Sequence, residues 1–196
     1  MKTLAINASA RKGGNTALLL RRALQELEKA GIETELVELA GERLQGCVGC
    51  RKCFAAKDKR CAVSDDAMNG YIEKMAGADA VLLGSPTYFA DCTAAMKALI
   101  ERAGMVGRAN GDMFRRKIGA AVVSVRRGGA IHAFDSMNHF FTISQMIIVG
   151  SSYWNIGVGR EPGDVEKDEE GLSTMSTLGQ NMAWLLRKLH AQEAQN

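Results

Sequence analysis

The sequence predicts one α/β domain, spanning residues 1–196, built on a parallel β-sheet. Short apolar runs alternate along the chain with segments in which apolar residues recur at helical spacing. One run, 80–83 (Ala-Val-Leu-Leu), is apolar throughout, as expected for a central parallel strand buried on both faces. A chain of 196 residues with 46% hydrophobic content and 2 prolines is large enough to bury a core, and no linker divides it.

The first part of the chain has the pattern strand, helix, strand. The first strand begins at 4–6, and the first helix begins at Thr16, with leucines on one face and charged residues on the other. Gly31 ends this helix, and residues 33–39 alternate as the second strand. A helix between two strands predicts that the strands lie parallel.

The rest of the chain repeats this alternation after a cysteine-rich loop. The predicted elements are a helix from the Asp65-Asp66 cap to about residue 76, the strand at 80–83, a helix through Ala95, Leu99 and Arg102 to Gly104, a strand at 117–123, a helix at 132–145, a strand at 146–150, a polar loop at 161–170 and a last helix from about Thr174. The sequence therefore predicts five strands separated by helices.

A polar loop, 7–15 (Asn-Ala-Ser-Ala-Arg-Lys-Gly-Gly-Asn), joins the first strand to the first helix. It offers hydroxyls, free backbone N–H groups, the positive end of a helix dipole and the charges of Arg11 and Lys12, which together suit a phosphate. An ordinary strand-to-helix turn with a Ser or Asn cap has the same composition. The loop matches neither the Walker A pattern nor G-x-G-x-x-G, so a phosphomonoester such as FMN fits better than ATP or NAD.

Two more strand exits carry loops suited to a ligand. The loop at 84–91 holds Tyr88 and Phe89, an aromatic pair that either flanks a flat ring system or packs in the core or on the surface. The loop at 124–130 is rich in glycine and carries Arg126 and Arg127. Ligands of open α/β sheets bind outside the carboxyl ends of the strands, so the agreement among three exits favours a ligand site there.

Four of the five cysteines lie in one stretch: Cys47, Cys50, Cys53 and Cys61. Thiolates at this spacing can converge on one inorganic centre without help from a distant part of the chain. We expect a [4Fe–4S] cluster. A structural zinc ion, free or redox-active thiols, and disulfides are the alternatives. We expect Cys92 to be a small buried hydrophobe, the alternative being a place near the flavin.

The chain resembles the iron–sulfur flavoprotein family, within the flavodoxin-like NAD(P)H-dependent FMN reductases. Residues 9–16 (Ser-Ala-Arg-Lys-Gly-Gly-Asn-Thr) resemble its Ser-Pro-Arg-Lys-x-Gly-Asn-Thr phosphate loop, with Ala10 in place of proline. Residues 84–89 resemble its Gly-Ser-Pro-x-Tyr-Phe flavin loop, and residues 126–129 fall at its second isoalloxazine loop. The cysteines fit its C-x2-C-x2-C-x(4–7)-C pattern, with the gap before Cys61 at the long end.

This resemblance implies a flavodoxin-like, doubly wound five-stranded parallel sheet of order 2-1-3-4-5, with a cluster-binding insertion at 47–61 between strands 2 and 3. The implied cofactors are FMN and a [4Fe–4S] cluster, with Cys47, Cys50, Cys53 and Cys61 as the metal ligands. The implied flavin-binding residues are Ser9, Arg11, Lys12, Gly14, Asn15, Thr16, Pro86, Thr87, Tyr88, Phe89, Ala90, Ser124, Arg126, Gly128 and Gly129. A homodimer or homotetramer is also implied, with the cluster of one subunit near the flavin of another.

By the same resemblance the protein is a flavin-dependent oxidoreductase that passes electrons from ferredoxin through the cluster to FMN and on to a small acceptor, such as oxygen, peroxide or a quinone. The flavin carries the chemistry, so no catalytic side chain is predicted. Two alternatives stay open. One is a cluster-free enzyme that reduces FMN or quinones with NAD(P)H, and the other is a zinc-bound interaction or redox-sensor module.

Charge and hydropathy argue against other classes of protein. The formal charge of +3 is spread over helix faces and is too small to indicate a nucleic-acid partner. No apolar run reaches the roughly 18 residues that a membrane span needs, and the chain starts without a cleavable apolar segment. We therefore expect a cytoplasmic protein with neither membrane nor nucleic-acid partners.

Overall fold

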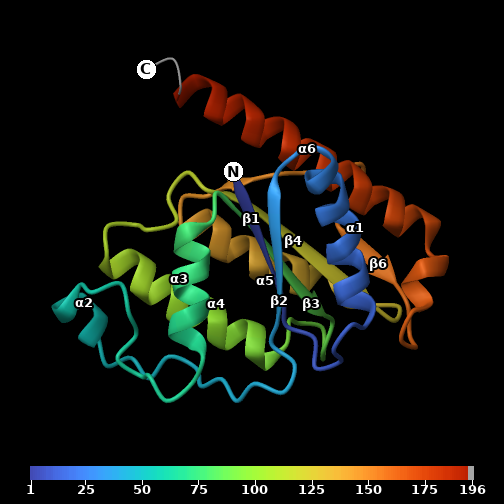
Figure 1. The fold of residues 1–196 in the computed structure, drawn as a ribbon. Coiled ribbons are helices and arrows are strands. Elements are labelled where there is room, and N and C mark those ends of the chain that lie inside the picture. Colours follow the sequence, from blue (N-terminus) through green and yellow to red (C-terminus); the bar gives the residue numbers. More distant parts are fainter. Residues whose placement is uncertain (194–196) are drawn as a thin grey trace.

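The computed structural model describes residues 1–193, which form a parallel sheet with helices on both faces (Figure 1). The strands are β1 (Lys2–Asn7), β2 (Glu33–Glu38), β3 (Ala80–Pro86), β4 (Ile118–Val125), β5 (Ile147–Ile148) and β6 (Ile156–Val158). Their order is β2-β1-β3-β4-β5, and β6 pairs with the later part of β4. The predicted order 2-1-3-4-5 is confirmed.

The helices form one layer on each face of the sheet. They are α1 (Asn15–Lys29), α2 (Lys52–Ala56), α3 (Met68–Gly77), α4 (Ala94–Ala109), α5 (Ala130–Ile143), the 3-10 helix η1 (Asp164–Lys167) and α6 (Glu169–Glu193). Helices α3, α4 and α5 cover one face, and α1 and α6 cover the other (Figure 1). Along β3, Val81 and Leu83 pack on the α3–α5 side and Leu82 on the α1–α6 side. This strand is apolar throughout because both of its faces are buried.

Gly84, near the end of β3, lets α1 approach the sheet. A Cβ atom here would lie 2.6 Å from Leu20 Cδ1 and 3.0 Å from Thr16 Cγ2. Such distances are too short for carbon atoms that are not bonded, so a larger residue would push α1 outward. The glycine therefore holds the first turn of α1 over the carboxyl ends of the central strands.

The sheet edge after β4 differs from the prediction. β5 contains only Ile147–Ile148 instead of 146–150, and β6 was not predicted. Asn155 is buried and joins the returning chain to β4: its Nδ2 donates to Ala121 O at 2.9 Å, and its carbonyl accepts from Val123 N at 2.9 Å. The three residues of β6 are too few to show a periodic pattern, and the polar contact that places them is not visible in the sequence.

Two helices extend beyond their predicted ends. α4 continues past Gly104 to Ala109, and α6 begins at Glu169 rather than near Thr174. The polar loop predicted at 161–170 contains η1 and the start of α6. Within residues 1–193, no helix is long and apolar enough to cross a membrane.

Candidate functional site

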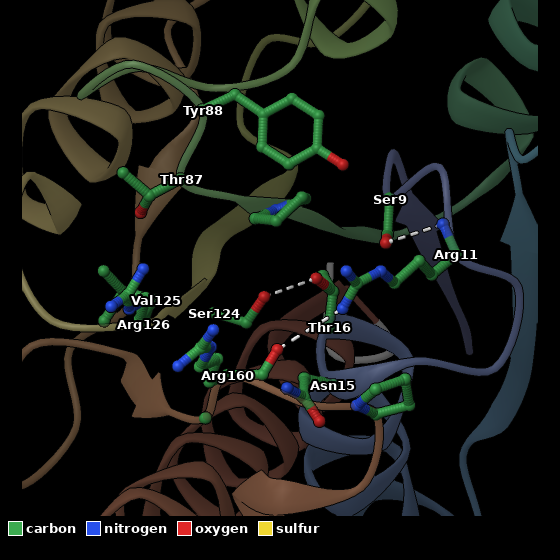
Figure 2. Close-up of a pocket in the computed structure, with 13 residues that line it drawn as sticks. Ser9, Arg11, Asn15, Thr16, Thr87, Tyr88, Ser124, Val125, Arg126 and Arg160 are labelled. Carbon is green, nitrogen blue, oxygen red and sulfur yellow. Dashed lines mark hydrogen bonds between the residues drawn. The ribbon is translucent and has the colours of Figure 1, made fainter.

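A cavity of about 170 Å³ opens at the carboxyl ends of β1, β3 and β4 (Figure 2). Its walls come from the β1–α1 loop, the exits of β3 and β4, and a fourth segment, 159–162, that follows β6. The lining residues are Ser9, Arg11, Asn15, Thr16, Pro86, Thr87, Tyr88, Ser124, Val125, Arg126, Gly159, Arg160 and Pro162. The three predicted loops therefore meet at one site.

Hydrogen bonds fix the β1–α1 loop at one end of the cavity. Ser9 N donates to Asn7 Oδ1 at 3.0 Å, and Arg11 N donates to Ser9 Oγ at 3.1 Å. Thr16 Oγ1 and Ser124 Oγ lie 2.7 Å apart, which ties the first turn of α1 to the end of β4. The result is a group of hydroxyls beside the positive end of a helix, an arrangement that suits a phosphate.

The charges around the cavity are positive. Arg11, Arg126 and Arg160 line it, and no acidic residue is among its described lining residues. The nearby carboxylate of Glu38 accepts from Gly13 N at 2.8 Å, outside the lining, so that N–H is not free for a ligand. Because positive side chains and hydroxyls gather without a carboxylate, the cavity suits a doubly charged anion such as a phosphomonoester.

A strained turn carries the aromatic pair and places one member, Tyr88, at the cavity. Tyr88 and Asp91 exchange two backbone hydrogen bonds of 2.8 and 3.0 Å around Phe89 and Ala90. Both central residues have positive φ, 49° and 63°, in the type of turn that normally takes Asn-Gly. Tyr88 lines the cavity, whereas the side chain of Phe89 is fully exposed.

Thr87, the residue before Tyr88, supplies an unused polar atom. Its Oγ1 is buried and has no hydrogen-bond partner among the described residues. A buried hydroxyl without a partner costs about 1–3 kcal/mol. A flat ligand with donors and acceptors along its edge, such as isoalloxazine, would remove this cost, so the residues present fit a flavin.

A second cavity, of about 20 Å³, is lined by all four clustered cysteines together with Arg102, Met105 and Val106 of α4. Three successive contacts join the cysteine loop to this helix. Cys47 N donates to Glu101 Oε2 at 3.2 Å, Cys61 Sγ accepts from Arg102 Nε at 3.3 Å, and Cys53 Sγ lies 3.9 Å from Met105 O. Helix α4 therefore anchors the cysteine loop through Cys47, Cys53 and Cys61, whereas Cys50 is exposed.

The four cysteines line one cavity but do not surround the position of a single metal ion. Among residues 1–193, no three His, Cys, Asp or Glu side chains are placed to share a single metal ion. In a [4Fe–4S] cluster each thiolate binds a different iron, so the four sulfurs stand around the centre and apart from one another. The donor set present, four cysteine thiols around one cavity, is the ligand set that such a cluster requires.

Cys92, the fifth cysteine, lies in the core, away from the lining of both cavities. Burial first, and then the neighbouring carboxylate of Asp91, raise the pKa of the Cys92 thiol to about 11. At neutral pH it is therefore an uncharged, unreactive group. The prediction of a small buried hydrophobe is confirmed.

Comparison with known proteins decides the assignment. Residues 1–161 match the family described as NADPH-dependent FMN reductase. An iron–sulfur flavoprotein of Methanocaldococcus jannaschii is 37% identical over 194 residues, which cover 95% of this chain and 98% of that protein. The chain belongs to the iron–sulfur flavoprotein family. As a member of this family, the protein is a flavin-dependent oxidoreductase of the FMN reductase group. The family descriptions indicate its two cofactors, FMN and an iron–sulfur centre.

Further comparisons agree with membership in the iron–sulfur flavoprotein family. A relative from Methanosarcina thermophila with the same description is 31% identical over 188 residues, 95% of each chain. The structure of RosB with a bound riboflavin-phosphate intermediate has a TM-score of 0.76 at 22% identity, covering 97% of this chain and 81% of that one. A quinone oxidoreductase from Methanothermobacter marburgensis has a TM-score of 0.66 at 16% identity, covering 93% and 96%. At these identities, the solved structures support the fold alone.

The structure divides the predicted flavin residues into two groups. Those that line the cavity are Ser9, Arg11, Asn15, Thr16, Pro86, Thr87, Tyr88, Ser124 and Arg126. Those outside the lining are Lys12, Gly14, Phe89, Ala90, Gly128 and Gly129. Of the second group, Gly14, Ala90 and Gly129 shape the two loops, whereas Lys12, Phe89 and Gly128 are exposed.

Sequence reasoning missed the segment at 159–162. Arg160 lines the cavity, and its carbonyl accepts from Arg11 Nη1 at 3.3 Å. Asn15 holds this segment with both ends of its amide, to Glu161 O at 2.9 Å and from Gly163 N at 2.8 Å. A signal was present, because Gly159-Arg160 has the same glycine-plus-arginine composition as the recognised exit at 126–129.

Gly129→Ala is expected to destabilise the protein and reduce its flavin content. Gly129 has φ of +86°, and an added Cβ would lie 3.0 Å from Ala90 Cα and 3.3 Å from Thr87 Cγ2. The left-handed backbone alone costs an L-residue about 1–2 kcal/mol, and the contact would displace the strained turn. Thermal unfolding and bound flavin measure both effects. Gly128→Ala is the control, since nothing lies within 4 Å of its added Cβ; equal losses in the two variants would contradict this role.

Proposed function

We propose that this member of the iron–sulfur flavoprotein family passes electrons from a reduced donor, a ferredoxin or a ferredoxin-like protein, through a [4Fe–4S] cluster to FMN and on to a small acceptor. The observation that carries the proposal is the pair of cavities: one lined by arginines and hydroxyls at the strand ends, the other by four cysteines. When bound, FMN can accept electrons one at a time and deliver two to an acceptor. The side chains bind and orient the cofactors, and no acid or base is assigned.

In this proposal the cavity at the strand ends holds FMN in one orientation. Ser9, Arg11 and Thr16 bind the phosphate at the end that Figure 2 draws beside α1. Thr87, Tyr88 and Arg126, which also line the cavity, would hold the isoalloxazine ring. The positively charged arginines of the lining favour the flavin in its more negative, reduced states.

The four cysteines hold the cluster in this proposal, and an exposed basic surface surrounds them. Its residues are Arg51, Lys52, Lys57, Lys59 and Arg60, all exposed. A positive surface of this kind steers an acidic protein such as a ferredoxin toward the cysteines.

Reduction by ferredoxin is therefore expected to slow as salt is raised, because salt screens exposed charges beyond about 8–10 Å. The variant Lys57→Glu with Lys59→Glu should lower the rate constant at low salt by roughly tenfold or more. Stopped-flow reduction of the protein measures this, with dithionite as a control donor that needs no docking surface. A rate with ferredoxin that depends on neither salt nor these lysines would argue for another donor.

The sequence-based expectation of a homodimer or homotetramer becomes part of the proposal. The two cavities share no described lining residue, and residues of α4 line the cysteine cavity but not the cavity at the strand ends. A second copy of the chain would bring the cysteines of one subunit close to the flavin of another. Dilution to the monomer should then abolish electron transfer from donor to acceptor while both cofactors stay bound. A monomer that transfers electrons at the full rate would contradict this arrangement.

The decisive experiment is anaerobic purification followed by iron, sulfide and flavin analysis with a visible spectrum. Flavin bands with a broad iron–sulfur shoulder and about four iron atoms per chain would support the proposal. Colourless protein would overturn it, and zinc without flavin would indicate the interaction or sensor module.

A second candidate function is supported by the family description. If the protein contains flavin and no iron, it is the cluster-free enzyme that reduces FMN or a quinone with NAD(P)H. Rapid bleaching of the flavin by NADPH would then separate it from a ferredoxin-dependent protein. In either case we place it in the cytoplasm, where a reducing environment keeps its five free cysteines from pairing.

A further inference from the structure

Arg102 is a buried charge that faces the cysteine cavity. Its side chain has 0% exposure, although it lies on α4 among apolar neighbours. The guanidinium forms an ion pair with Asp66 and donates to Val63 O and to Gln45 O, the last at 3.2 Å. A guanidinium without solvent is tolerated only where its donors are paired, and these contacts pair its two terminal nitrogens.

The Nε–H donor of Arg102 points to sulfur. Nε carries a single hydrogen, and its acceptor is Cys61 Sγ at 3.3 Å. The planar guanidinium cannot rotate this hydrogen elsewhere without breaking the contacts to Asp66 and Gln45. The ion pair therefore aims one N–H at one cysteine sulfur.

Cys61 is the cysteine that most needs such support. It follows Cys53 by eight positions, whereas Cys47, Cys50 and Cys53 are spaced by three. The buried side chain of Asn69, on α3, clamps its backbone: Cys61 N donates to Asn69 Oδ1 at 2.7 Å, and Asn69 Nδ2 donates to Cys61 O at 3.0 Å. Helix α3 thus fixes the backbone of Cys61, and α4 fixes its sulfur.

We infer that Arg102 is a positioning residue of the iron–sulfur centre: its Nε–H holds Cys61 Sγ at the cavity and raises the reduction potential of the cluster. This inference rests on the proposed function, which puts the cluster at the four cysteines. Arg102 differs from the basic surface around the loop because Arg51 and its neighbours are exposed and screened by salt, whereas the charge of Arg102 is buried.

The expected direction follows from charge. One-electron reduction makes the cluster and its thiolates more negative by one charge. A hydrogen bond to a ligand sulfur and a nearby buried cation stabilise the more negative state more than the oxidised one. Removing both should therefore make the cluster harder to reduce.

The test compares anaerobically purified wild type, Arg102→Lys, Arg102→Met and, as matched control, Arg108→Met, which removes an exposed arginine from the same helix. The measurement is the cluster potential from an EPR-monitored dithionite titration. Arg102→Met should lower the equilibrium constant for reduction about tenfold, which is about 59 mV for a one-electron couple. Arg102→Lys keeps the charge but lacks the planar guanidinium. Its cluster potential should therefore lie between those of Arg102→Met and wild type. Arg108→Met should match wild type.

Iron and flavin contents separate the other outcomes. Arg102→Met with flavin but without iron, and iron restored in Arg102→Lys, also supports the inference, because the flavin reports an intact fold. A cluster with unchanged potential in Arg102→Met overturns the inference and leaves the proposed function intact. Wild type with flavin and no iron overturns the proposed function itself.

If Arg102→Met yields no folded protein, wild type labelled with 15N-arginine decides the question. The reduced cluster should then show a 15N coupling in its pulsed EPR spectrum, and the coupling should persist when the exposed Arg51 is replaced in Arg51→Gln. Absence of the coupling in labelled wild type would overturn the inference.

Discussion

Replacing Ser9 and Arg11 together with alanine is expected to yield protein that folds but does not retain flavin. Arg11 is one of three arginines in the cavity lining, and the Ser9 hydroxyl accepts from Arg11 N within the phosphate loop. Hydrogen bonds to a charged group contribute about 1.5–3 kcal/mol each. Losing two such contacts should weaken FMN binding by roughly 10²–10⁴-fold, since each 1.4 kcal/mol is tenfold.

Lys12→Ala is the matched control for this prediction. Lys12 carries the same charge and is the next residue after Arg11, but it is exposed and lies outside the lining. Flavin fluorescence during titration of apoprotein with FMN gives the dissociation constants, and circular dichroism reports the fold. Full flavin occupancy in the double variant would show that FMN does not bind in this cavity. A loss in Lys12→Ala as large as in the double variant would mean that net charge, and not the lining, decides binding.

The parts of the fold that rest on local patterns could be predicted from the sequence. Residues 80–83 are apolar throughout because β3 is buried on both faces, and this burial is a property of any central parallel strand. The β1–α1 loop was recognisable because a phosphate site needs hydroxyls, N–H groups and cations within a few residues. Both features lie in one continuous segment, so their meaning does not depend on distant residues.

Features that depend on distant contacts could not be predicted in this way. β6 is placed by the buried Asn155, which reaches across to Ala121. Arg160 enters the flavin cavity because Asn15 holds the segment that carries it, more than 140 positions along the chain. A sequence pattern records neither contact, because each joins two segments that look like ordinary loops.

The burial of Arg102 is an intermediate case. It lies three positions after Leu99 and four before Val106, on the apolar stripe of α4. An arginine within such a stripe signals a buried partner, but the sequence does not say which one. The structure adds Asp66 and the sulfur of Cys61, and with them the reason for the charge.

Arg102→Met is expected to lower the free energy of unfolding at pH 7 by about 3–5 kcal/mol, the usual cost of removing one partner of a buried ion pair. The side chain of Asp66 is only 7% exposed, so its carboxylate would stay buried without its cation. Removing both charges in the double variant Arg102→Met with Asp66→Asn should recover part of the loss. Anaerobic urea denaturation followed by circular dichroism measures all three proteins, and Arg108→Met should show no loss.

The same pair predicts how this stability difference changes with pH. Burial acts to raise the pKa of Asp66, but the hydrogen bonds from Arg102 and from the N–H groups of Gln45 and Met68 outweigh it and hold the pKa below its usual value. A carboxyl with a lowered folded pKa stabilises the fold above its unfolded pKa of about 3.9. That contribution is lost as pH falls through the lower, folded value. In Arg102→Met the buried carboxyl of Asp66 has lost its cation, so burial should raise its folded pKa. The gap between wild type and Arg102→Met should therefore begin to shrink as pH falls through that raised pKa and keep shrinking toward the lowered pKa of wild type. A gap that persists unchanged at pH 3 would mean that packing of the Arg102 side chain, and not its charge, stabilises the cysteine loop.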